Sequence, residues 1–180
     1  DAKISVVISN NQQAYALERA KKRNVDAICV SPKSYEIRQE FYVQLMEEIR
    51  SRKIDVIVLA GYLVQISSEM VDAFPMKILN IHPSLIPSFC GKGCYGIHVH
   101  ENALERGVKI TGATVHFVDG GTDTGPIILQ KAVNVLPGDT PERLQKRVME
   151  EAEWVILPEA IQLYVQGRLK VVDGQVIVEE

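Results

Sequence analysis

The sequence predicts an α/β fold built on an open, mainly parallel, twisted sheet flanked by helices. Short β-branched apolar runs, such as residues 4–9 and 56–59, alternate with longer segments of helical periodicity. No two-residue hairpin turn separates the strand-like runs of the first half, which disfavours an antiparallel sheet there. With 180 residues and 46% apolar content, residues 1–180 can form a single domain with its own core.

Each element of the first half has a local signal. The periodicity of residues 12–23 predicts a helix, and Ser34 is a suitable N-cap for a second helix that ends near residue 52. Apolar residues recur in this second helix at positions 41, 45 and 49, which defines one buried face. The other elements expected here are strands at residues 4–9, 27–30, 56–59 and 77–81 and a short helix at residues 68–73.

The second half begins with a loop at residues 83–96, which contain two prolines and three glycines. Thr140 and Pro141 open a long helix, and Pro158 is expected to kink it or split it in two. The other expected elements are a helix at residues 99–106, strands at 111–118 and 127–135 joined by a polar loop at 119–126, and a C-terminal β-hairpin at 171–178 that turns at residues 173–174.

Composition excludes several classes of protein. The net charge of −3 gives no basic field for nucleic acid, and no apolar run approaches the roughly 18 residues of a membrane span. Three cysteines, Cys29, Cys90 and Cys94, are too few for a disulfide framework and favour a reducing, cytoplasmic compartment. The N-terminus lacks the basic and apolar segments of a secretory signal.

We expect candidate catalytic and binding residues at the strand ends, because ligands of open parallel sheets bind beyond the carboxyl ends of the strands. Asn80 and His82 alternate onto the same side of an extended segment, where an amide donor and an imidazole suit a developing oxyanion. Asp123, in the polar loop, could pair with His82 and favour its protonated form. A structural histidine and solvated loop acids remain the alternatives. Gly61, after an apolar strand, allows a ligand to approach the backbone, or marks a plain turn.

Two further constellations are disfavoured. Cys90, Cys94, His98 and His100 offer four soft ligands, but a single residue between the histidines does not match the usual zinc spacing of three to five, so no metal is predicted. A nucleophilic role for Cys90 or Cys94 would require a lowered thiol pKa. The positive charge of the nearby Lys92 is the only sequence feature that would favour one.

Taken together, four motifs resemble the phosphoribosylglycinamide formyltransferase family. They are Ala-Gly-Tyr at residues 60–62, Asn-Ile-His-Pro-Ser-Leu-Ile-Pro at 80–87, Gly-Ala-Thr-Val-His-Phe-Val at 112–118 and Asp-Thr-Gly-Pro-Ile-Ile-Leu-Gln at 123–130. The resemblance covers essentially the whole chain in the same order. It implies a Rossmann-like fold and transfer of a formyl group from 10-formyltetrahydrofolate to glycinamide ribonucleotide, without a metal.

The resemblance also implies roles for individual residues. The catalytic residues would be Asn80, His82 and Asp123. The substrate-binding residues would be Pro83, Glu153, Arg38, Thr114 and His116, with Thr114 and His116 packed behind the catalytic trio. The folate pocket would be lined by Leu59, Leu63, Val64, Ile66, Val118 and Asp119. The implied partners are small molecules rather than nucleic acid or membrane, with the chain acting as a monomer or homodimer.

One departure from the family pattern concerns the N-terminus. Residues 4–11 resemble the family's second strand, so the usual first strand and its glycine-containing phosphate loop are expected to be absent. Either the chain is a fragment, or residues 3–23 replace that unit with Asn10 and Asn11 nearest the phosphate, or a partner chain supplies the strand. Two other functions stay open: hydrolysis of 10-formyltetrahydrofolate, for which Pro83 would usually be His, and an inactive folate-binding module.

Overall fold

The computed structural model describes residues 2–179, which fall into two compact units. We call Asp1–Asp55 the N-terminal unit and Val56–Glu180 the C-terminal unit. The expected single domain stays a prediction.

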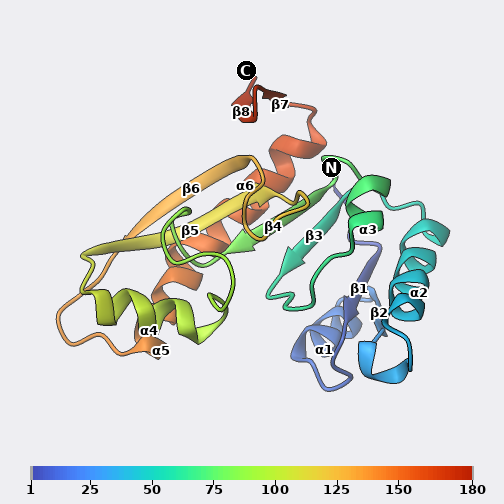
Figure 1. Cartoon of the computed structure of the whole chain (residues 1–180), viewed down its shortest axis with the longest axis horizontal. Helices are drawn as coiled ribbons and strands as arrows, with labels where there is room; N and C mark the ends of the chain where they lie inside the picture. The colour runs from blue at the N-terminus through green and yellow to red at the C-terminus, as the bar shows by residue number, and fades with distance from the viewer. Residues whose placement is uncertain (1, 180) are drawn as a thin grey trace. The chain divides into compact units, whose positions relative to one another are not determined.

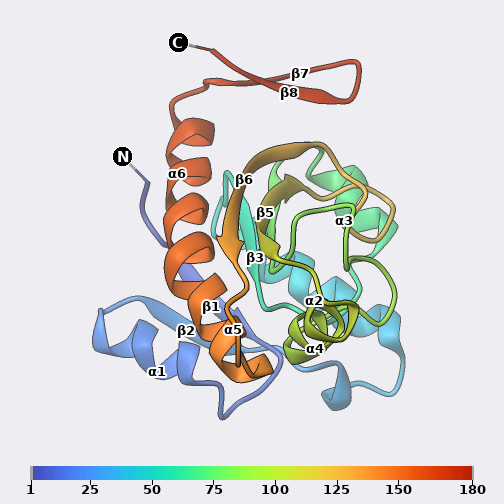
Figure 2. The same cartoon turned by 90° about the vertical axis from the view of Figure 1, so that its left-hand side faces the viewer.

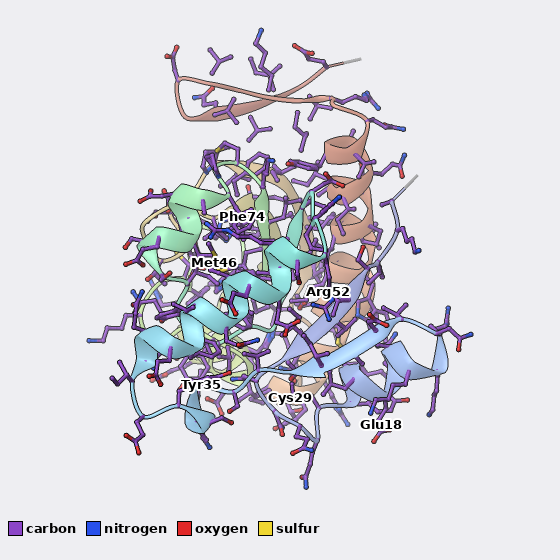
Figure 3. All side chains as sticks on the ribbon, turned by 90° about the vertical axis from the view of Figure 1, so that its right-hand side faces the viewer. Glu18, Cys29, Tyr35, Met46, Arg52 and Phe74 are labelled. Carbon is purple, nitrogen blue, oxygen red and sulfur yellow. The ribbon has the colours of Figure 1, made fainter. Side chains whose placement is uncertain are left out.

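The N-terminal unit contains one parallel strand pair. Its elements are β1 (Val6–Ser9), α1 (Tyr15–Lys22), β2 (Asp26–Cys29), a 3₁₀ turn (Pro32–Ser34) and α2 (Arg38–Ser51). Strands β1 and β2 pair in parallel from Val6 opposite Asp26 to Ser9 opposite Cys29. Figure 3 labels Cys29 at the end of β2 and Met46 on α2. The predicted parallel arrangement is therefore confirmed for these strands.

The predicted cap of α2 is wrong. Ser34 ends the 3₁₀ turn, which Ser31 caps by accepting a hydrogen bond from the Lys33 amide at 3.3 Å. Helix α2 starts later, at Arg38, after Ile37 in an extended conformation. Pro32 favours the tight 3₁₀ turn, so Ser34 belongs to this turn and not to the start of α2. The predicted buried face of Phe41, Leu45 and Ile49 is confirmed.

The C-terminal unit is built on a four-stranded mixed sheet. The strands are β3 (Ile57–Ala60), β4 (Ile78–His82), β5 (Ile110–Phe117) and β6 (Ile127–Asn134), adjacent in that order (Figure 1). Strands β3 and β4 are parallel, whereas β5 is antiparallel to both β4 and β6. The loop from β5 to β6 is shorter than the dozen or so residues that a parallel crossover needs. The sheet of this unit is thus mixed rather than mainly parallel.

Helical segments complete the C-terminal unit. They are α3 (Ser68–Ala73), α4 (Ile97–Arg106), α5 (Pro141–Val148), a π-helical segment (Met149–Glu153) and α6 (Trp154–Val165). One face of the sheet presents Leu79, Ile81, Val115 and Phe117 to apolar residues of α5, the π-helical segment and α6. Figure 2 shows α6 running beside the sheet, with the C-terminal hairpin at its end.

The long C-terminal helix is interrupted, but not at Pro158, where the sequence predicted a kink or a split. Thr140 caps α5 as expected, accepting a hydrogen bond from the Arg143 amide at 3.3 Å. Pro158, however, lies inside α6, and the regular helix is interrupted earlier, by the π-helical segment. The wider π turns just before α6 change the local register, as π-helical insertions do in α-helices.

The C-terminal hairpin matches its prediction. Strands β7 (Leu169–Val172) and β8 (Gln175–Val178) pair antiparallel around Asp173 and Gly174. Both turn residues have positive φ, at 50° and 76°, as a two-residue hairpin turn with Asp-Gly requires. Within residues 2–179, none of the helices is long and apolar enough to cross a bilayer.

The ion pair between Asp139 and Arg147 predicts a pH-dependent contribution to stability. Arg147 Nη1 and Nη2 donate to the two Asp139 oxygens at 2.5 and 2.7 Å, and the Leu136 amide donates to Oδ2 at 2.8 Å. The Arg147 hydrogen bonds lower the pKa of Asp139 from 3.8 to about 2. The stabilisation is therefore present above the unfolded-state value and is lost as the pH falls towards the folded-state value.

We expect Asp139→Asn to lower the free energy of unfolding by about 1–2 kcal/mol at pH 7. Chemical denaturation across pH should show this difference shrinking below about pH 4, because the parent carboxylate is then progressively protonated. Glu150→Gln is the control, since its exposed pair with Lys146, at 3.8 Å, should contribute less than about 0.5 kcal/mol. A difference that persists undiminished near pH 2 would contradict this assignment.

Candidate active site

The register of β4, β5 and β6 gathers polar side chains on the sheet face opposite the core residues. Asn80 lies opposite His116, and His82 lies opposite Thr114. Because directly opposed residues of antiparallel strands share a face, all four point the same way. This face is buried as well: His82, Thr114 and His116 are each 5% exposed or less.

Asn80 is held by His116. The Asn80 amide nitrogen lies 3.1 Å from His116 Nε2, and His116 Nδ1 lies 2.8 Å from the Phe117 carbonyl oxygen. Since the carbonyl can only accept, Nδ1 carries the proton and a neutral Nε2 accepts from Asn80. Burial lowers the pKa of His116, partly opposed by the Phe117 hydrogen bond and the Asp123 charge, so the neutral form dominates near pH 7. One N–H of Asn80 is thereby fixed and the other is left to act as a donor.

His82 is held by the loop that follows it. Its Nε2 lies 2.9 Å from the Phe89 carbonyl oxygen, so Nε2 donates a proton to that acceptor. The other ring nitrogen, Nδ1, faces Asp123 Oδ2 at 3.7 Å. The loop backbone thus sets the orientation of the imidazole and directs Nδ1 towards the carboxylate.

Asp123 is brought to the two histidines by the polar loop after β5. Its Oδ2 accepts a hydrogen bond from the Gly91 amide at 2.9 Å, and its Oδ1 lies 3.7 Å from His116 Nε2. The side chain is 13% exposed. Asp123 adopts the left-handed region, with φ of 56°, a conformation that costs energy for a non-glycine residue but that Asp tolerates better than most. Asn80, His82 and Asp123 therefore converge as the sequence predicted.

The remaining predicted substrate residues have different surroundings. The Thr114 hydroxyl is fully buried, and its three hydrogen bonds all go to protein groups. Pro83 is partly buried directly after β4. Glu153 ends the π-helical segment, and burial raises the pKa of its carboxyl group. A π-helical turn often marks a functional site, and a half-buried carboxylate suits contact with ligand hydroxyl or amine groups.

The expected folate-pocket residues lie on two segments of the C-terminal unit. Leu59 is on β3, in register with Asn80, and Leu63, Val64 and Ile66 follow that strand. These side chains are half-buried apart from Leu63, which is 65% exposed. Val118 and Asp119 begin the polar loop, where Asp119 Oδ1 accepts from the Thr124 hydroxyl at 2.6 Å and the Gly121 amide at 3.0 Å. Their contacts with a ligand stay a prediction.

Arg38 belongs to the N-terminal unit, and its predicted contact with substrate likewise stays a prediction. Within that unit its Nε donates to the Tyr42 hydroxyl at 3.2 Å, and its guanidinium lies 5.8 Å from the Tyr42 ring centroid.

The cysteine and histidine constellation does not gather at one point. Residues 2–179 contain no group of three or more His, Cys, Asp or Glu side chains arranged to hold a metal ion. His98 pairs with Glu101 at 2.8 Å, while His100 is fully buried on α4, where burial lowers its pKa to about 4. Burial, with Asp123 as the second cause, raises the pKa of the Cys90 thiol, which opposes a nucleophilic role.

Sequence reasoning missed the backbone groups of the loop after β4. The Phe89 carbonyl and the Gly91 amide contact His82 and Asp123 directly, and the buried Ser84 hydroxyl donates to the Ser88 carbonyl at 2.5 Å. Backbone groups leave no residue-type signature. The only available signal was the concentration of glycine and proline in residues 83–96, which indicated a loop without indicating its contacts.

Comparisons with known proteins identify relatives over most of the chain. The formyl transferase family model matches residues 1–161. A chloroplastic phosphoribosylglycinamide formyltransferase of Arabidopsis thaliana is 47% identical over 71% of this chain and 43% of its own length. The phosphoribosylglycinamide formyltransferase of Bacillus subtilis is 39% identical over 86% of this chain and 77% of its own length.

Two solved structures are similar over nearly the whole chain. The glycinamide ribonucleotide transformylase 1 of Symbiobacterium toebii superposes with a TM-score of 0.90 and 45% identity, covering 98% of this chain and 80% of that one. A formyltetrahydrofolate deformylase of Pseudomonas syringae gives a TM-score of 0.88 at 27% identity, covering 100% of this chain and 57% of that one. The chain therefore belongs to the formyl transferase family.

A close backbone approach at Gly125 provides a test of the polar loop. A Cβ at this position would lie 1.8 Å from the Phe117 carbonyl oxygen, whereas a Cβ at Gly120 would have no heavy atom within 4 Å. We expect Gly125→Ala to displace the loop, lower the melting temperature by roughly 5 °C or more, and speed hydrogen exchange of the Gly91 amide. Gly120→Ala is the matched control and should change neither quantity. Equal behaviour of the two variants would refute the proposed packing.

Proposed function

We propose that this chain transfers the formyl group of 10-formyltetrahydrofolate to the primary amine of glycinamide ribonucleotide, a step of purine biosynthesis. The observation that carries the proposal is the convergence of Asn80, His82 and Asp123 at the carboxyl end of β4, in a chain of the formyl transferase family. The names of the Bacillus and Symbiobacterium relatives supply the substrate. Because the chain spans only 43% of the Arabidopsis protein, the activity is proposed here.

In this mechanism the amine attacks the formyl carbon and negative charge develops on the formyl oxygen. The second N–H of Asn80 and a protonated His82 Nδ1 donate to that oxygen. One such preorganised donor accelerates a reaction by roughly 10²–10³-fold. His116 and the Phe89 carbonyl contribute by fixing the two donors before the substrate arrives, so little reorganisation is needed during the reaction.

Asp123 has two roles in the proposal. Its carboxylate lies 3.7 Å from His82 Nδ1, so its negative charge faces the imidazole that donates to the formyl oxygen. It also accepts the proton that the attacking amine loses, directly or through a water molecule. When the tetrahedral intermediate collapses, the bond between the formyl carbon and folate N10 breaks, and the proton that Asp123 took from the amine passes to N10, directly or through water. The weakly basic aryl amine is a good enough leaving group for this step to proceed by acid–base chemistry.

The other predicted residues bind the two substrates in this proposal. The half-buried apolar groups Leu59, Val64 and Ile66 would pack against the folate ring system, with Val118 and Asp119 on the opposite wall. Glu153 would contact the ribose or amine end of the nucleotide. Holding both substrates together supplies much of the remaining rate acceleration, because the reaction becomes effectively unimolecular.

We further propose a cytoplasmic location and small-molecule partners, with the chain acting as a monomer or homodimer. The thiols of Cys29, Cys90 and Cys94 are all unpaired, which fits a reducing compartment.

Asp123→Asn should separate catalysis from folding. Asparagine keeps the shape of the side chain and tolerates positive φ, so the melting temperature should stay within about 3 °C of the parent, while kcat falls by about 10²-fold or more. The matched control is Asp173→Asn, because Asp173 also has positive φ, at 50°, but lies in the exposed hairpin turn. Near-normal turnover of the Asp123 variant would remove this carboxylate from the mechanism.

Hydrolysis of 10-formyltetrahydrofolate is the second candidate, favoured by the similarity to the Pseudomonas deformylase. Water would then replace the amine as nucleophile, with the same three residues. Formate release and formyl-glycinamide ribonucleotide should be measured in parallel, with and without glycinamide ribonucleotide. We expect the formyl donor to be consumed at least about 100-fold faster with the amine than without it, because the bound amine is held in position to attack the formyl carbon. Formate release at an equal rate without the amine would favour the hydrolase.

A further inference from the structure

We propose that Gln130 and Thr114 are positioning residues that clamp the backbone of residues 84–86 and thereby hold the 83–96 loop against His82 and Asp123. We refer to these two side chains as the loop clamp. The inference rests on the proposed function only in that the groups being positioned are the proposed catalytic ones; the contacts that define the clamp are independent of it.

Thr114 forms the inner half of the loop clamp. Its hydroxyl donates to the Ser84 carbonyl at 2.7 Å and accepts from the Ile86 amide at 3.1 Å and from Gln130 Nε2 at 3.0 Å. A hydroxyl has one proton and two lone pairs, so every hydrogen-bonding site of this one is used. Because the side chain is fully buried, a substrate could contact the hydroxyl only by displacing a protein partner.

Gln130 forms the outer half. It lies opposite Thr114 in the β5–β6 register, on the outer strand of the four-stranded sheet. Its amide nitrogen donates to the Thr114 hydroxyl and to the Ile86 carbonyl, both at 3.0 Å. An amide group has two N–H donors, and both are directed inward, although the residue as a whole is exposed. Ile86 is consequently bound through both its N–H and its carbonyl.

The clamped segment leads directly to the groups that orient His82 and Asp123. The Ser84 hydroxyl donates to the Ser88 carbonyl at 2.5 Å and approaches the Phe89 carbonyl at 3.3 Å. The Phe89 carbonyl accepts from His82, and the Gly91 amide two residues later donates to Asp123. Hydrogen bonds and the short stretches of chain between them therefore connect the outer strand β6 to both His82 and Asp123.

The geometry favours positioning over direct contact or plain structural support. His82, Thr114 and Gln130 form one cross-strand row, so a shift at one end is passed to its neighbour. Loosening the clamp would leave the core on the opposite sheet face intact, since that face consists of other residues. Its loss should consequently reduce kcat more than it reduces thermal stability or substrate binding.

The test compares four variants of the full chain. Gln130→Leu removes the amide at similar size, Thr114→Val removes the hydroxyl, Thr114→Ser retains it, and Gln175→Leu alters an exposed strand glutamine in the hairpin as a control. We expect kcat to fall about tenfold in Gln130→Leu and about 100-fold in Thr114→Val, with KM for either substrate changed less than about threefold. Thr114→Ser should recover most of the activity, and Gln175→Leu should retain all of it.

A double variant sharpens the result. Because the two side chains hydrogen-bond to each other and hold the same backbone segment, kcat in Gln130→Leu combined with Thr114→Val should fall by less than the product of the two single effects. Hydrogen exchange measured without substrates should show faster exchange of the Ile86 and Gly91 amides in Gln130→Leu and in Thr114→Val, but not in Gln175→Leu.

Unchanged exchange and unchanged kcat in Gln130→Leu would overturn the proposal, as would a fall in kcat matched by an equal rise in KM. Failure of the proposed function looks different: the parent would transfer no formyl group, while exchange at Ile86 and Gly91 would still respond to the variants. The exchange measurement thus judges the loop clamp whatever reaction the site performs.

Discussion

The site depends on two backbone contacts made by a single loop. The Phe89 carbonyl fixes one nitrogen of His82, and the Gly91 amide fixes one oxygen of Asp123. These contacts set the two side chains facing each other at 3.7 Å, close enough for electrostatic coupling but without a direct hydrogen bond. A loop that folded differently would leave His82 and Asp123 in the sequence without their mutual orientation.

The two faces of the mixed sheet have different roles: one packs against the apolar core, and the other carries the polar side chains of the site. Leu79 and Ile81 point to the apolar core, while the alternating Asn80 and His82 point to the site. Residues 111–117 of strand β5 are buried on both faces, and the polar side chains of Thr114 and His116 hydrogen-bond to protein groups. Such groups lose their hydration on folding, and their satisfied hydrogen bonds make their orientations specific.

Sequence patterns located the strands and the hairpin turn and placed Asn80 and His82 on one side of a strand, because strand alternation is a local property. The pairing of Asp123 with His82 was one of several alternatives that the residues left open, and the trio was implied by the family resemblance. Sequence patterns missed the π-helical segment, because Pro158 carried a stronger local signal than any residue at the true interruption. The mixed character of the sheet was also missed, since strand direction depends on long-range pairing. The polar residues that alternate with apolar ones along β5 face a buried site and not solvent. The sequence pattern is the same in both cases, so only the tertiary structure distinguishes them.

A crystal structure of the protein with a stable analogue of 10-formyltetrahydrofolate would test the central claim most directly. The account predicts that the formyl oxygen, or the atom replacing it, lies about 2.7–3.1 Å from both the Asn80 amide nitrogen and His82 Nδ1. Asp123 should remain on the side from which an amine would approach. An analogue whose formyl group lies away from Asn80 and His82, with both side chains keeping only their protein partners, would contradict the account.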